Sequence, residues 1–270
     1  MKTKKPKSRL ELKRFVNEHI GKYGPNVDLN HIDVSGITDM SYLFSGDLIS
    51  DFNGDISQWD VSNVKNMKCM FRRSKFNGDI SRWNVSNVRD MSYMFEDSKF
   101  NQDISKWNVS NAEDMEGMFQ ESEFNQDISR WNVSNVKNMS WMFARSKFNK
   151  DISRWDVSNV EIMERMFLSS EFNKNIGKWN VSNVRNMESM FAYSKFNQDI
   201  GNWDVSNVKY FDYMFANNRY FYQDLSNWNL EKTYSVKGMF RKTKITKQDI
   251  INWGWQKFKI IEFFGIDEFF

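Results

Sequence analysis

Apolar residues recur along most of the chain at one spacing, with polar residues between them. In eight successive copies, a six-residue segment carries apolar residues at its first, fourth and sixth positions, and the fourth is tryptophan. Ile80–Val85 and Ile128–Val133 are typical copies. This is the L-x-x-L-x-L spacing of a leucine-rich repeat, in which that segment is a short strand. We therefore expect one short strand per copy.

The period of the apolar positions changes after each such segment. Val64, Met67, Met70 and Phe71 follow a spacing of i, i+3, i+6 and i+7, which lines one face of a helix. A Val-Ser-Asn triplet before it offers polar side chains for the helix N-cap. The pattern predicts an α/β repeat: a right-handed leucine-rich-repeat-like solenoid with one short parallel strand and one short helix per coil of about 24 residues. A three-faced β-helix of similar period is the alternative.

Degenerate copies extend the array at both ends, so that we count ten coils. Because a repeat stack needs a polar cover at each end, we divide the chain into an N-terminal cap helix (1–25), a repeat solenoid (26–240), and a degenerate last coil with a C-terminal cap (241–270). The amphipathic segment Leu10–Ile20 is the expected cap helix, and Phe258–Phe270 is the expected cover of the other end.

The tryptophan at each fourth position suggests two roles. A ladder of aromatic rings can stack sugars or bases. However, the residue two positions later shares the face of each tryptophan and is apolar in every copy, which favours a core position. We expect the row from Trp59 to Trp228 to be buried, and the methionine rows to be core filler rather than ligands of a soft metal.

The residue before each tryptophan faces away from that core. In five consecutive coils it is a cation, and this candidate binding site, the basic stripe, consists of Arg82, Lys106, Arg130, Arg154 and Lys178. At the spacing of adjacent strands the stripe would be about 20 Å long. It predicts a surface for an anionic partner. The alternative is a solvated face on which the cations pair with neighbouring Asp and Asn side chains.

An aspartate stands immediately before most of the six-residue segments. Its copies are Asp55, Asp79, Asp103, Asp127, Asp151, Asp199 and Asp224, with Asn175 as the interruption. Stacked carboxylates repel each other unless they bond amides or pair with bases, so we expect them to stabilise loops. A calcium array is the alternative, but one carboxylate per coil falls short of the 6–8 oxygen ligands that calcium takes.

Composition narrows the possible functions. The chain has 270 residues with 38 Lys and Arg against 35 Asp and Glu, a formal charge of +3 that points neither to nucleic acid nor to a membrane surface. Its single cysteine is Cys69, and it has two histidines, so neither a disulfide framework nor a zinc site is expected. No nucleophile and base pair, phosphate loop or metal spacing stands out, which predicts a protein without enzymatic activity, cofactor or metal. No apolar run is long enough to span a membrane.

The repeat unit Phe-Asn-x-Asp-Ile-Ser-x-Trp-Asp/Asn-Val-Ser-Asn-Val-x-x-Met-x-x-Met-Phe closely resembles the BspA-like leucine-rich-repeat surface proteins, in the branch of Mycoplasma-type lipoprotein-associated repeats of unknown function. The resemblance covers about residues 28–240. It implies a bacterial repeat protein of the cell surface that binds proteins, with adhesion to a host as one role. The expected partner is thus a protein of unknown identity.

Two other functions are consistent with the sequence. The N-terminus has no apolar stretch typical of a signal peptide, which favours a cytoplasmic location over the cell surface implied by the resemblance. An intracellular scaffold that recognises a protein partner is therefore the first alternative, and a glycan-binding module is the second. Nucleic acid is not an expected partner, and no membrane span is expected.

Overall fold

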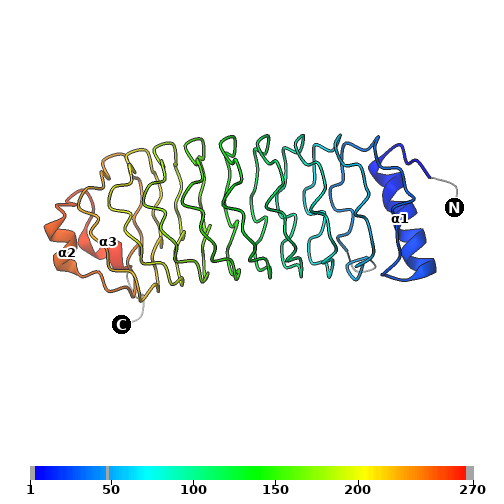
Figure 1. The fold of residues 1–270 in the computed structure, drawn as a ribbon. Coiled ribbons are helices and arrows are strands. Elements are labelled where there is room, and N and C mark those ends of the chain that lie inside the picture. Colours follow the sequence, from blue (N-terminus) through cyan, green and yellow to red (C-terminus); the bar gives the residue numbers. More distant parts are fainter. Residues whose placement is uncertain (1–3, 47–48, 266–270) are drawn as a thin grey trace.

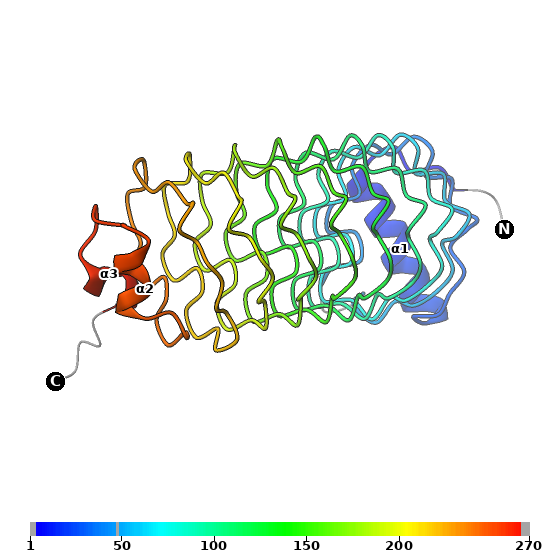
Figure 2. The ribbon, with the colours of Figure 1, turned by 60° about the vertical axis from the view of Figure 1, so that its left-hand side comes forward.

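The chain forms a row of similar coils that lie side by side, as the computed structural model shows for residues 4–46 and 49–265 (Figure 1). Helix α1 (Arg9–Tyr23) lies across one end of the row. Helices α2 (Lys247–Asn252) and α3 (Ile260–Phe264) lie at the other end (Figure 2). Residues 1–3 of the expected N-terminal cap and 266–270 of the expected C-terminal cap lie outside the described residues.

The expected strand and helix in each coil are wrong. Between α1 and α2, the described residues contain no helix and no strand longer than an isolated bridge. These bridges are parallel, and one column of them joins each coil to the next from Asp39 to Ser235. The molecule is therefore neither a leucine-rich-repeat-like α/β solenoid nor a three-faced β-helix, and the coils are made of turns.

The segment predicted as a strand is a tight turn. The Trp83 amide donates to the Ile80 carbonyl over 3.1 Å, which closes a four-residue turn. The Ser81 amide donates to Oδ1 of Asp79 over 2.9 Å, which is an Asx turn. Ile80 and Trp83 thus reach the same core because the chain reverses between them, whereas a strand would place residues of that separation on opposite faces.

A second turn of the same kind follows and leads into the predicted helix. In it, the Val88 amide donates to the Val85 carbonyl over 2.9 Å, and the Ser86 amide donates to Asn84 Oδ1 over 3.2 Å. A sequence of Asp or Asn, an apolar residue, two variable residues and a second apolar residue therefore forms one turn unit. Each full coil contains three turns of this kind in succession, although Ile162, Tyr210 and Ser235 replace the Asp or Asn of the third turn in three coils.

The third turn unit explains why no helix forms. The Met94 amide donates to the Met91 carbonyl over 3.2 Å, and Asp90 caps the turn. Tyr93, the third residue of this turn, has a φ of 55°, and Asp97 has a φ of 49°. Positive φ at that position is what a type II turn requires, and it interrupts a right-handed helix. Both left-handed positions recur from coil to coil.

Backbone hydrogen bonds join the third turn units of neighbouring coils. The Cys69 amide donates to the Ser92 carbonyl, and the Phe71 amide to the Met94 carbonyl, each over 2.9 Å. These alternate amides all point toward the C-terminal end of the stack. Without the terminal helices, the first coil would consequently present unpaired carbonyls at the N-terminal end, and the last coil would present unpaired amides at the other.

Helix α1 supplies cations to the carbonyl end of the stack. Arg9 Nη1 donates to the Ser41 carbonyl over 3.1 Å, and Lys13 Nζ donates to the Tyr42 carbonyl over 2.7 Å. The apolar face of α1, which includes the fully buried Leu12, covers the first coil. The helix therefore satisfies both the apolar surface and the aligned carbonyls that the stack would otherwise expose.

Helix α3 supplies acceptors at the amide end. The Gly238 amide donates to the Glu262 carbonyl over 2.7 Å, and the Phe240 amide donates to the Phe263 carbonyl over 2.8 Å. The side chain of Phe263 is fully buried beneath the last coil. The two ends of the stack are thus closed by complementary chemistry, with cationic donors at one end and carbonyl acceptors at the other.

Columns of identical side chains fill the interior. Rings of Phe76 and Phe100 stack with centroids 6.3 Å apart, and those of Phe71 and Phe95 with centroids 5.6 Å apart. Adjacent strands joined by bridges lie about 4.8 Å apart, so the spacing between coils widens away from the bridge column. All these rings are buried, and each large buried side chain contributes about 1.5–3 kcal/mol to stability.

Candidate binding surfaces

The tryptophan row is part of the core, as the sequence predicts. Its members from Trp59 to Trp228 are 2–4% exposed. Each indole Nε1 donates across a coil boundary, as Trp131 does to the Ile104 carbonyl over 3.1 Å. The methionine rows are also buried. The tryptophans of this row therefore cannot form a platform for sugars or bases.

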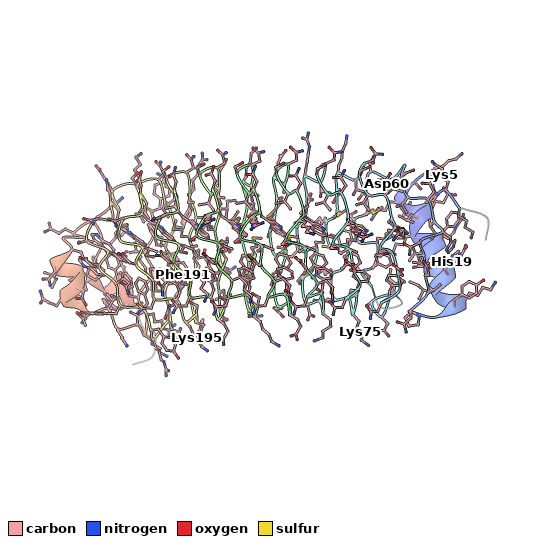
Figure 3. All side chains as sticks on the ribbon, in the orientation of Figure 1. Lys5, His19, Asp60, Lys75, Phe191 and Lys195 are labelled. Atoms are coloured by element: carbon pink, nitrogen blue, oxygen red, sulfur yellow. The ribbon has the colours of Figure 1, made fainter. Side chains whose placement is uncertain are left out.

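The five cations of the basic stripe are all exposed. Each lies at the third position of the first turn unit, directly before the buried tryptophan, so the turn directs its side chain outward while the tryptophan points into the core. In each coil, the first turn unit comes after the repeat position of Lys75 and before the repeat position of Asp60. Lys75 and Asp60 lie near opposite long edges of the molecule (Figure 3). The stripe thus runs along the face between the two edges.

Several cations elsewhere in the array are paired with acids of a neighbouring coil. Lys147 Nζ lies 2.6 Å from Glu123 Oε2, and Lys195 Nζ lies 2.9 Å from Glu171 Oε2. Other cations with such a partner are Arg72, Lys75, Arg89, Lys99, Arg145, Arg165 and Arg185. Within residues 4–46 and 49–265, none of the five stripe cations forms an ion pair.

The aspartates beside the stripe are engaged with their own turns, as expected for loop-stabilising residues. Asp127 Oδ1 accepts from the Ser129 amide over 2.9 Å. Hydrogen bonds from the Ser129 amide and hydroxyl hold the pKa of Asp127 below its ordinary value, and the charge of Arg130 lowers it further. No ion pair joins this row to a stripe cation among the described residues, and none joins a stripe cation to Asp60, Asp156 or their equivalents two residues after each cation, which was the alternative.

A cavity of about 580 Å³ lies at the C-terminal end of the stripe. Three exposed lysines line it, namely Lys150, Lys174 and the stripe residue Lys178. Asn175 stands in this cavity at the place of the usual aspartate, and its Oδ1 accepts from the Gly177 amide over 2.9 Å. The asparagine therefore keeps the turn and removes one negative charge, which makes this the most cationic part of the stripe.

Sequence analysis missed the lysine cluster, although a signal for it was present. Asn175 interrupts the aspartate ladder, and Lys150 and Lys174 occupy a position that is glycine or glutamine in the other full coils. The two changes fall in adjacent coils. Only the structure shows that Lys150, Lys174 and Asn175 line one cavity together with Lys178.

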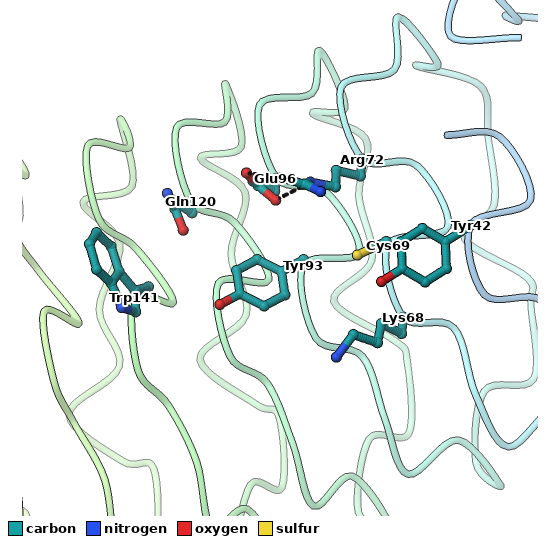
Figure 4. A pocket seen from close by; sticks show the side chains of 8 residues that line it. All are labelled: Tyr42, Lys68, Cys69, Arg72, Tyr93, Glu96, Gln120 and Trp141. Atoms are coloured by element: carbon teal, nitrogen blue, oxygen red, sulfur yellow. Dashed lines mark hydrogen bonds and ion pairs between the residues drawn. The ribbon is translucent and has the colours of Figure 1, made fainter. Parts of the chain in front are cut away.

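A second cavity, of about 390 Å³, lies at the third turn units, where the coils are bridged. Figure 4 shows three aromatic rings in a row along it, from Tyr42, Tyr93 and Trp141, with the Arg72 and Glu96 pair to one side. Nη2 of Arg72 lies 3.1 Å from Oε1 of Glu96. Half-buried rings beside planar polar groups are typical of small-ligand sites.

Two rings of this cavity have different neighbours in the next coil: Tyr93 lies beside Gly117, and the Arg165 guanidinium lies 4.7 Å from the centroid of the Trp141 ring. A Cβ atom at Gly117 would come within 2.4 Å of the Tyr93 ring, so a side chain there is excluded. The Tyr93 hydroxyl donates to Glu116, and burial together with this bond raises the pKa of Tyr93. Burial also raises the pKa of the Cys69 thiol in the same cavity, which disfavours the reactive thiolate.

Two other classes of site were sought in the described ranges. None of the helices in these ranges is long and apolar enough to cross a membrane. No group of three or more histidine, cysteine, aspartate or glutamate side chains in them could hold a metal ion.

The stacked coils and their end caps define a repeat protein. The chain belongs to the family described as Mycoplasma protein of unknown function, DUF285, whose model matches residues 13–123, 99–195 and 163–264. These matches support the Mycoplasma-type part of the resemblance and give no support to a BspA-like or leucine-rich-repeat identity. Comparison with curated proteins and with solved structures finds no match.

Proposed function

We propose that the chain is a non-enzymatic binding protein whose basic stripe holds an acidic surface of a protein partner. The observation that carries this proposal is the contrast among the cations. Nine described cations on the other rows have an acidic partner in an adjacent coil, whereas the five cations of the stripe are exposed and none of them has such a partner in the part of the chain described. Five adjacent cations without partners attract an anionic surface at long range and fix its position.

Adhesion to a host protein is a more specific form of the proposal and rests on the family resemblance alone. An intracellular scaffold would use the same stripe for a partner inside the cell. Fractionation of cells followed by immunodetection of the full chain separates the two, because an adhesin is recovered with surface material and is accessible to added protease, whereas a scaffold is protected until the cells are lysed.

The test of the stripe uses two variants with the same change in net charge. Lys106→Gln, Arg130→Gln and Arg154→Gln together remove three stripe cations, and glutamine already occupies this position at Gln58. The control is Lys65→Gln, Lys237→Gln and Lys242→Gln, which removes three exposed cations from other rows. Binding of fluorescent poly-L-glutamate to the full chain is measured by anisotropy at low and physiological salt.

The stripe variant is expected to bind poly-L-glutamate about tenfold more weakly at low salt, since each exposed ion pair is worth about 0–1 kcal/mol. The difference should shrink as salt is added, because screening weakens exposed charge pairs. The control variant should bind as the parent chain does. Equal loss in both variants, or no loss in the stripe variant, would contradict the proposal.

A glycan-binding function is the second candidate, and the aromatic cavity favours it. Trp141→Ala removes one ring of that cavity, and Tyr193→Ala removes an aromatic side chain that is 63% exposed in a different row. On a panel of neutral and acidic oligosaccharides, the glycan function predicts that the parent and Tyr193→Ala chains retain the same sugars and that Trp141→Ala loses them. No retained sugar, or equal retention by all three chains, would exclude it.

A further inference from the structure

We propose that the ligand of the basic stripe is an extended peptide segment with an acidic side chain at every second residue, one for each coil. This inference rests on the proposed function and names the kind of partner that the stripe accepts. It follows from the spacing of the coils, from the length of the stripe and from the distribution of charge along it.

The distances between the buried tryptophan rings give the spacing of the coils beside the stripe. Centroids of Trp59 and Trp83 are 6.4 Å apart with planes 6° from parallel, and those of Trp131 and Trp155 are 6.5 Å apart with planes 4° from parallel. Because the rings are almost parallel, these distances measure the translation from one coil to the next. Each stripe cation directly precedes one of the row's tryptophans, so the cations recur at nearly the same interval.

This interval matches one chain conformation. In an extended segment, alternate side chains lie on the same face and recur about every 6.4–6.8 Å. In an α-helix, side chains four residues apart rise about 6.0 Å but rotate by about 40° at each step, so a fifth acid would be about 160° away from the first. An extended segment therefore keeps all its acids on the stripe, whereas a helix does not.

The length of the ligand segment follows from the ends of the stripe. Four intervals of 6.4 Å separate Arg82 from Lys178, a distance of about 26 Å, longer than strand spacing predicts. The coils on either side carry the uncharged Gln58 and Asn202 at the same position. Five acids at alternate positions, a segment of nine residues, therefore fill the stripe.

The cluster of Lys150, Lys174 and Lys178 makes the C-terminal end of the stripe the strongest site for an acidic side chain. Lys150 and Lys174 stand beside Lys178 in one cavity, and Asn175 leaves that cavity with one carboxylate fewer than the other coils would supply. Asp151 is the acid that lines this cavity, and its Oδ1 accepts from the Ser153 amide over 2.9 Å. The acid at this end of the segment thus meets three cations, and the others meet one each.

The test compares two nine-residue peptides of the same composition, acetylated and amidated at their ends. The first alternates Glu and Ser and begins and ends with Glu. The second is Glu-Glu-Glu-Ser-Ser-Ser-Ser-Glu-Glu. Binding of each to the full chain is measured by fluorescence anisotropy at low salt, and the alternating peptide is expected to bind about five- to tenfold more tightly because all five acids stay in register.

The outcomes distinguish this inference from the proposed function. If both peptides bind equally well and the stripe variant loses both, the stripe binds acids without register, and the inference is wrong while the function stands. If neither peptide binds, and poly-L-glutamate does not bind, the proposed function fails. If a nine-nucleotide oligothymidylate binds more tightly than the alternating peptide, a peptide is the wrong ligand class.

A single substitution tests the end preference. Asn175→Asp keeps the oxygen that accepts from the Gly177 amide but restores the missing charge, so the alternating peptide should bind about threefold more weakly. The control is Asn66→Asp, which makes the same change in an Asx turn of the bridge column, where Oδ1 accepts from the Lys68 amide over 2.9 Å. Equal binding by both variants would overturn the role of the lysine cluster.

Discussion

Replacing Trp131 tests whether the columns of buried rings hold the coils together. Its side chain is 3% exposed, its ring lies 6.2 Å from that of Phe119, and its indole donates to the Ile104 carbonyl. Truncation of a buried tryptophan to alanine costs about 3–5 kcal/mol. Loss of the hydrogen bond adds about 1 kcal/mol, and no more, because the Ile104 carbonyl also accepts from the Trp107 amide.

We therefore expect Trp131→Ala to lower the free energy of unfolding by about 4–6 kcal/mol. Trp131→Phe keeps most of the ring volume and loses the hydrogen bond, so it should cost about 1–2.5 kcal/mol. Trp141→Ala is the matched control, because Trp141 lies outside the row and is only partly buried.

The measurement is urea unfolding followed by circular dichroism, with hydrogen exchange to locate the damage. Since each coil contacts only its neighbours, the loss of protection should centre on the coils next to Trp131 and fade toward both ends. A Trp131→Ala variant within about 1 kcal/mol of the parent, or a loss of protection equal along the whole chain, would refute the reasoning about packing.

Three further changes test the turns and the cap. Asp127→Ala removes the acceptor of the Ser129 amide and should lower the free energy of unfolding in urea by about 1 kcal/mol, whereas Asp127→Asn keeps that acceptor and should cost less than about 0.5 kcal/mol; equal effects would contradict the Asx turn. Burial and the nearby His19 lower the pKa of His31, so the folded state binds fewer protons than the unfolded state. Stability present above the ordinary pKa of about 6.5 should thus be lost as the pH falls, and His31→Gln should flatten this dependence in thermal unfolding between pH 5 and 7.5. Lys13→Met leaves first-coil carbonyls without their donor and should speed hydrogen exchange in α1; unchanged exchange would show that the lysine is dispensable.

The core could be predicted from sequence, but its local conformation was not. Burial of Trp131 followed from the apolar pattern alone. The same pattern led to strand and helix because apolar residues at i and i+3 line one face of a helix and also close a tight turn. The distinguishing signal was the Asp or Asn before each apolar pair, such as Asp79 before Ile80, which favours an Asx turn. The positive φ of Tyr93 could not be predicted from its residue type, because glycine is the residue usually found in the left-handed conformation.

The candidate site was predicted in outline. The stripe from Arg82 to Lys178 follows from position in the repeat, since the residue before a buried tryptophan is exposed whether the segment is a strand or a turn. The absence of ion pairs at the described stripe residues required the structure, because it depends on the distances between each cation and the carboxylates around it. The spacing between coils also required the structure, since it differs between the bridge column and the stripe.

The proposed acidic segment lies along the basic stripe with one side chain per coil. The most direct measurement replaces the first or the last Glu of the alternating peptide with a photoreactive residue and maps the cross-links by mass spectrometry. We expect the two peptides to label opposite ends of the stripe, one near Arg82 and the other near Lys178. Cross-links from both peptides to one coil, or to the cavity lined by Tyr42 and Trp141, would contradict it.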